Sequence, residues 1–159
     1  MATIMGVPID YKIKRKSWWM RVTNANAYVA WFGQLRVPSK RDVYILEAAK
    51  TDPSMIPQRA TLVHEGVHIY RQKKIGKWLW NWKYLWRKKT FRYTEELIAY
   101  KAEIRYLESK GRRVSLEYYA GKLSGSMYGH AVSHADALKD LEAWRTSGAR
   151  VDFISVSSG

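Results

Sequence analysis

The spacing of apolar and polar positions changes once along the chain, from a two-residue period to a helical one. Residues 9–14 alternate apolar and polar side chains, which is typical of a half-buried strand. Two further strand candidates are 28–37, which Pro38 ends, and 42–47, with Val43-Tyr44-Ile45-Leu46 at its centre. The pattern therefore predicts a small, mostly antiparallel sheet of three strands.

Beyond residue 50 the apolar residues recur three and four positions apart, which indicates helices. Ser133, with Asp136 three residues on, resembles a capping box and would start the last helix. Gly76 and Gly111 are natural ends for the helices that precede them. The predicted helices are 58–74, 94–109, 115–123 and 133–144.

These elements predict an α+β fold in which a small three-stranded sheet is followed by a helical core. A length of 159 residues fits one domain, and 47% apolar residues suffice for a globular chain. We therefore expect a single domain over 1–159, mostly strands in 1–50, mostly helices in 54–146 and a loosely held tail in 147–159.

Composition narrows the possible chemistry and partners. The chain has no cysteine, so a metal must bind through His, Asp or Glu. A net charge of +14 attracts anions, which suits either a merely solubilising surface or an anionic partner such as nucleic acid, a cell-envelope polymer or an acidic protein. No apolar run approaches the roughly 20 residues of a membrane helix, so we expect no transmembrane segment, no signal peptide, and a cytoplasmic or virion-associated protein.

The most specific motif is His64-Glu65-Gly66-Val67-His68, an H-E-x-x-H pattern within the predicted helix 58–74. Helical residues four apart share one face, so both imidazoles can bind one Zn²⁺ at about 2.0–2.1 Å. Glu65 would point beside the ion, where a general base can take a proton from water. Two ordinary helix histidines are the alternative interpretation.

A catalytic zinc takes three protein ligands, so the third must come from elsewhere in the chain. Glu96 lies near the start of the predicted helix 94–109, and Ala99 one turn later would leave room for the metal helix. Glu95 is the alternative ligand and Glu103 a more distant one. We therefore predict His64, His68 and Glu96 as the zinc ligands.

The pairing of H-E-x-x-H with Glu96-Leu97-Ile98-Ala99, an E-x-x-A pattern, resembles the gluzincin branch of the zincin metallopeptidases, especially its compact members. The resemblance implies that His64, His68 and Glu96 bind zinc and that Glu65 is the base. Gln72 also looks like the H-x-x-x-Q continuation of small bacterial and phage-type metallopeptidases.

The resemblance covers about residues 40–105 and implies further roles. An edge strand before the metal helix, here Val43-Tyr44-Ile45-Leu46, would bind extended substrate by backbone pairing. The chain departs from the pattern at Tyr100, where several relatives have an aspartate that orients a zinc histidine. Glu103, Asp52 or a backbone carbonyl are left as candidates for that support.

A downstream His or Tyr often donates a hydrogen bond to the oxyanion in zincins that this chain resembles, which points to His130 or Tyr128. Such a donor can be worth roughly 3 kcal/mol of barrier. A surface histidine and a packed tyrosine are the alternative. His130 and His134 are also four apart, but Gly129 and the cap at Ser133 argue against a second metal pair.

Residues 77–89 mix aromatic and basic side chains. Such a mixture suits single-stranded nucleic acid, a membrane interface or a protein-docking surface. A packed hairpin over the metal helix is the favoured alternative, because aromatic residues dominate cores. The residues concerned are Trp78, Trp80, Trp82, Trp86, Lys77, Lys83, Arg87, Lys88 and Lys89.

Together these features predict a zinc-dependent metallopeptidase, a hydrolase that cleaves peptide or protein substrates through an activated water. The alternative is a zinc-stabilised structural or assembly component, for example of a phage particle, whose basic surface binds nucleic acid or another anionic polymer. A closed fourth coordination position would favour the structural role, and an open one would favour catalysis.

Overall fold

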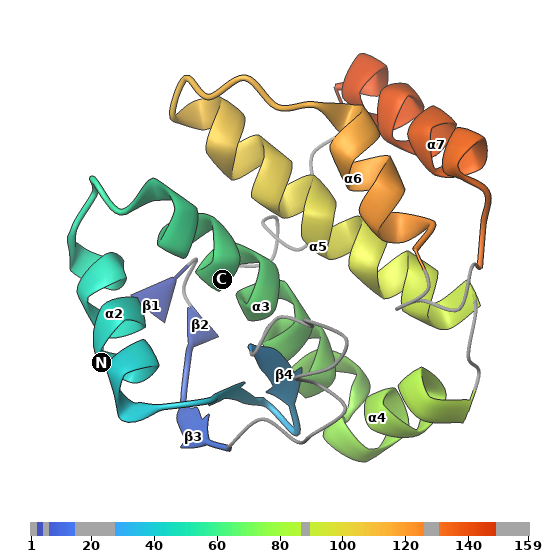
Figure 1. Ribbon diagram of the computed structural model, residues 1–159. Helices are drawn as coiled ribbons and strands as arrows, with labels where there is room; N and C mark the ends of the chain where they lie inside the picture. Colours follow the sequence, from blue (N-terminus) through green and yellow to red (C-terminus); the bar gives the residue numbers. More distant parts are fainter. Residues whose placement is uncertain (1–2, 5–6, 15–27, 87–89, 126–130, 149–159) are drawn as a thin grey trace. The chain divides into compact units, whose positions relative to one another are not determined.

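The predicted α+β class is confirmed by the computed structural model, in which the described residues form a small three-stranded sheet and six helices (Figure 1). The structure describes residues 3–4, 7–14, 28–86, 90–125 and 131–148. The chain forms two compact units, residues 1–78 and 79–159. The expectation of a single domain stays a prediction. Within the described residues, no helix combines the length and apolarity needed to cross a membrane.

The sheet of the first unit has the order β3-β5-β4, so β5 is central. β4 pairs antiparallel with β5, whereas β3 pairs with it in parallel. The expected mostly antiparallel sheet is therefore wrong for one of its two pairings. A separate antiparallel pair, β1 and β2, precedes this sheet. The strands are β1 (Thr3–Ile4), β2 (Val7–Pro8), β3 (Tyr11–Ile13), β4 (Val29–Trp31) and β5 (Gln34–Val37).

A two-residue turn, Phe32-Gly33, joins β4 to β5. Both turn residues have positive φ, 52° and 77°, as the tight hairpin turns that match strand twist require. Trp31 pairs with Gln34 directly across the turn. In an antiparallel pair, hydrogen-bonded and non-hydrogen-bonded residue pairs alternate. Trp31 and Gln34 form the hydrogen-bonded pair beside the turn, so the next pair, Ala30 and Leu35, is not hydrogen-bonded. The N–H and C=O of Ala30 therefore point away from β5, at the open edge of the sheet.

The strand predicted at residues 42–47 is wrong, because these residues lie in helix α2 (Lys40–Thr51). Ser39 caps this helix: its hydroxyl oxygen accepts the backbone N–H of Asp42. The buried apolar residues Leu46 and Ala49 follow at helical spacing, while Tyr44 is 81% exposed. The cap and the helical burial pattern outweigh the strand preference of the β-branched residues.

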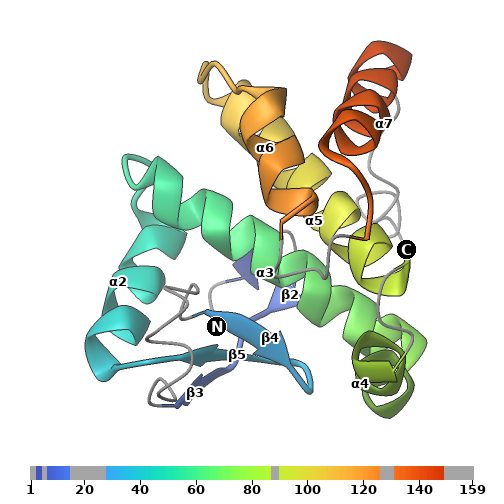
Figure 2. The same cartoon turned by 45° about the vertical axis from the view of Figure 1, so that its right-hand side comes forward.

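Helix α3 (Ile56–Ile75) confirms and slightly extends the helix predicted at 58–74. Pro57 lies in its first turn, where a missing N–H costs nothing, and Gly76 ends it with a φ of 99°. α3 packs against α2 and against strands of both sheets, as Figure 2 shows for β4 and β5. Both histidines of α3 are buried.

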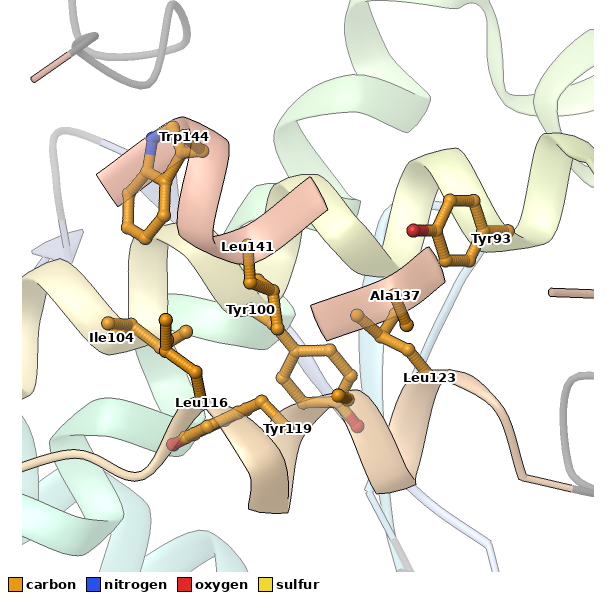
Figure 3. Packing of buried hydrophobic residues seen from close by; sticks show 10 residues of the cluster. Tyr93, Tyr100, Ile104, Leu116, Tyr119, Leu123, Ala137, Leu141 and Trp144 are labelled. Atoms are coloured by element: carbon orange, nitrogen blue, oxygen red, sulfur yellow. The ribbon is translucent and has the colours of Figure 1, made fainter. Parts of the chain in front are cut away.

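The second unit is helical. Ser133 accepts the backbone N–H of Asp136, which confirms the predicted cap of α7, and Ser115 caps α6 in the same way. Helices α5, α6 and α7 share one apolar core, in which Tyr100 meets Tyr119 edge-on (Figure 3). The helices are α4 (Lys77–Trp86), which begins at the end of the first unit, α5 (Thr90–Ser109), α6 (Leu116–Leu123) and α7 (His134–Ser147).

The tryptophan-rich stretch is helix α4, so the favoured hairpin is wrong. Its apolar residues surround the helix, which hides the helical period in the sequence. Trp80 is only 2% exposed, whereas Trp78, Trp82 and Trp86 are exposed. α4 therefore has one packed face and one open apolar face.

Candidate metal centre

His64 and His68 lie one turn apart on α3, in the helical context that the H-E-x-x-H motif needs. Both are buried, with 8% and 5% of their surface exposed. Their ring centroids are 5.0 Å apart and their planes meet at 73°. Two imidazoles this close on one helix face can share a metal ion.

Glu65, between the two histidines, is held by the edge of the sheet. Its Oε2 accepts a hydrogen bond of 2.9 Å from the backbone N–H of Ala30 on β4. That N–H is one of the two Ala30 groups that point away from β5. The sheet therefore fixes the direction of the carboxylate that the motif marks as the base.

Gln72, two turns beyond Glu65 on α3, binds the same hairpin and is fully buried. Its Nε2 donates to the C=O of Ala30 at 2.9 Å, and its Oε1 accepts the N–H of Gly33 at 2.6 Å. Two α3 side chains thus satisfy both outward backbone groups of Ala30. The structure gives Gln72 a definite role, which is to attach the β4–β5 hairpin to the metal helix.

The proposed substrate-binding strand needs correction. Residues 43–46 lie within α2, where their backbone groups belong to the helix, so they cannot pair with an extended peptide. β4 is the edge strand that faces α3. At Ala30 its outward N–H and C=O are already engaged by Glu65 and Gln72.

In the second unit, Glu95 and Glu96 are both buried on α5. The Tyr84 hydroxyl donates to Oε1 of Glu96 at 2.9 Å, and the Trp80 indole N–H donates to Oε2 of Glu95 at 2.8 Å. The two rings stack with centroids 4.6 Å apart. Each buried carboxylate thus receives the hydrogen bond that burial demands.

Tyr84 is itself held in place by Arg92. The guanidinium lies 5.0 Å from the centre of the Tyr84 ring, and Arg92 Nε donates to the Tyr84 carbonyl at 2.6 Å. The sequence analysis missed this role of Tyr84. Tyr84 lies 12 residues before Glu96 on another helix, so no local spacing in the sequence links the two residues.

The remaining predicted residues have other surroundings. Glu103 accepts a 2.9 Å hydrogen bond from the Tyr119 hydroxyl, and burial together with this carboxylate raises the pKa of Tyr119. Asp52 is exposed and accepts from Ser54. His134 is exposed at the start of α7. Tyr100 lies in the core of the second unit.

Tyr128 and His130, the candidate oxyanion donors, lie outside the described residues, so their role stays a prediction. Comparisons of the chain with protein-family models, with curated proteins and with solved structures find no match. The resemblance to gluzincins therefore depends on the two short motifs alone. The local chemistry of α3, β4 and α5 has to carry any functional proposal.

Proposed function

We propose that this protein is a zinc-dependent peptidase in which His64, His68 and Glu96 hold the ion. The observation that carries the proposal is the buried pair of imidazoles on α3, with Glu65 anchored beside them. Among the described residues, these two histidines and Glu96 are a buried group that could hold a metal ion. Two imidazoles and one carboxylate are a donor set of catalytic zinc sites.

When bound, zinc supplies Lewis-acid chemistry that makes water a usable nucleophile near neutral pH. Glu65 would accept the proton of the attacking water and pass it to the leaving amine. The Ala30 N–H holds one oxygen of this carboxylate, so its orientation does not have to be established during the reaction. In the second unit, Tyr84 orients the Glu96 carboxylate as a ligand.

The test is Glu65→Gln, which keeps the side-chain size and an oxygen for the Ala30 N–H but removes the base. Bound zinc, measured by elemental analysis, should equal that of the wild type. Cleavage of a mixed peptide library, followed by mass spectrometry, should fall by about 10²–10⁴-fold. Cleavage that continues at the wild-type rate would exclude Glu65 as the base.

A zinc site that only stabilises the fold is the second candidate function, in the setting of a structural or assembly component. The burial of both histidines favours it, because a catalytic ion needs access to substrate. In that case the wild type binds zinc and loses stability when zinc is removed, yet cleaves no peptide of the library. Glu65→Gln would then match the wild type in every measurement.

A further inference from the structure

Helix α4 has a second face that takes no part in binding the two glutamates. Trp80 and Asn81 are buried, and Tyr84 reaches Glu96 from the same side of the helix. The opposite side carries large apolar residues with exposed fractions between 43% and 80%. They are Trp78, Leu79, Trp82, Leu85 and Trp86, which we call the outer face of α4.

Such a concentration of exposed apolar side chains is unusual for a soluble surface. Nine large hydrophobic residues are exposed in the described part of the chain, and five of them belong to this one helix of ten residues. The other four are distributed over β3, β4, α2 and α6. Single exposed residues need no explanation, but a continuous apolar face indicates a partner that covers it.

The positive charge of this part of the sequence favours an anionic partner. α4 contains Lys77 and Lys83 and no acidic residue, and the sequence continues with Arg87-Lys88-Lys89. The whole chain carries a net charge of +14. Tryptophan and leucine on one side, with lysines nearby, are typical of helices that lie in the interface of anionic membranes.

Nucleic acid fits the same face less well. Base stacking uses free aromatic ring faces, but Trp82 and Trp86 stack on each other with centroids 5.3 Å apart. Leu79 and Leu85 offer no ring at all, although they would gain from burial among acyl chains. A helix of ten residues is also far too short to span a bilayer, so it would lie in the plane of the interface.

We propose that the outer face of α4 docks onto the surface of an anionic lipid membrane, with Trp82 and Trp86 inserted below the headgroups. The proposal is independent of the zinc site. Glu65→Gln should therefore bind vesicles as the wild type does, and failure of the peptidase proposal leaves this one standing.

The experiment is co-sedimentation of the full chain with vesicles of phosphatidylcholine alone or with 30% phosphatidylserine. The variant Trp82→Ser/Trp86→Ser should lower the partition coefficient on the anionic vesicles at least tenfold. The matched control is Tyr44→Ser/Tyr118→Ser, because these aromatic residues are 81% and 59% exposed outside α4. The control should stay within about twofold of the wild type.

Brominated acyl chains add a readout of insertion, because bromine quenches nearby tryptophan. Quenching should occur in the wild type and decrease in the Trp82→Ser/Trp86→Ser variant. Vesicle binding without quenching would mean that the basic surface merely adsorbs, and it would overturn the proposal. Equal partitioning of the two double variants onto anionic vesicles would also overturn the proposal. So would wild-type binding to single-stranded DNA that is tighter than binding to vesicles and that the Trp82→Ser/Trp86→Ser variant loses.

Discussion

At the scale of residues, the adjacent glutamates of α5 provide a matched pair for identifying the third ligand of the proposed zinc site. Both are buried, and each accepts a hydrogen bond from an aromatic donor that a glutamine oxygen can also accept. Glu96→Gln should lower zinc affinity by at least about 100-fold, because an amide is a much poorer ligand than a carboxylate. Glu95→Gln should change it by less than about threefold. Competition with a chromogenic chelator measures both, and the reverse result would make Glu95 the ligand.

Tyr84→Phe tests the same proposed site through a residue that contacts Glu96 and is not itself a proposed ligand. It removes the hydroxyl that binds Glu96 but keeps the ring on which Arg92 and Trp80 pack. Loss of such a supporting hydrogen bond should weaken zinc binding about tenfold, which is less than loss of the ligand itself. Unchanged affinity in the same competition assay would show that the hydroxyl does not position a ligand.

A pH effect is expected at Asp42, at the start of α2. Burial alone would raise its pKa, but hydrogen bonds from the Ser39 and Tyr28 hydroxyls lower the pKa below its usual value. A lowered pKa stabilises the fold above the unfolded value of about 3.9, and this contribution is lost as pH falls through the folded value. Asp42→Asn should therefore lower the free energy of unfolding by about 1 kcal/mol at neutral pH.

Urea unfolding at about pH 7 and about pH 3 measures the difference between wild type and Asp42→Asn. The difference should shrink at the lower pH, where the wild-type carboxylate takes up its proton. The same contact raises the pKa of Tyr28 to about 12, because burial and the Asp42 carboxylate both disfavour the phenolate. If Asp42→Asn lowered the free energy of unfolding equally at both pH values, its effect would come from the changed shape of the side chain and not from the lost charge.

At the scale of elements, the β4–β5 hairpin depends on one buried side chain of α3. Gln72→Leu keeps an apolar volume but leaves the C=O of Ala30 and the N–H of Gly33 without their partner. Two such losses should reduce the free energy of unfolding by about 2–4 kcal/mol. The control is Gln58→Leu, the same substitution at a half-buried position of the same helix. In urea unfolding, the free energy of unfolding of Gln58→Leu should stay within about 0.5 kcal/mol of the wild type. Equal losses in Gln58→Leu and Gln72→Leu would contradict this role of Gln72.

Elements with a local signature could be predicted from the sequence, and those that depend on distant partners could not. The helices around His64, Glu96 and Ser133 follow from apolar spacing and caps that lie within a few residues. The S-x-x-D cap at Ser39 has the same form as that at Ser133, but strand-forming residues directly after Asp42 concealed it. Helix α4 was ambiguous because apolar residues occur on both of its faces.

The candidate site divides in the same way. The motif histidines and Glu65 are recognisable because their spacing lies within two turns of one helix. The anchor of Glu65 is not, because its donor is a backbone N–H 35 residues earlier, and a backbone group has no signature in the sequence. Tyr84 lies 12 residues before Glu96, and its role emerges only when α4 packs on α5.

At the scale of the whole molecule, zinc bound at the proposed site should stabilise the fold by an amount that rises with the logarithm of its affinity. A ligand that binds only the folded state at 100 times its dissociation constant adds about 2.7 kcal/mol. Thermal unfolding should therefore shift to higher temperature with zinc but not with an equal concentration of magnesium, which prefers oxygen ligands. His68→Gln should remove most of the shift, while Glu65→Gln should keep it. An equal shift in His68→Gln would place the stabilising zinc elsewhere.

In the proposed peptidase, the hydrogen bond between Ala30 and Glu65 would make catalysis depend on the completion of folding. The helix that bears the motif can form from local interactions, but its carboxylate is directed only after a hairpin from a distant stretch of chain has docked. A partly folded or misregistered chain would carry the motif without an oriented proton acceptor. The architecture would thus restrain premature proteolysis of the newly made protein and its neighbours, with no need for a separate inhibitory segment.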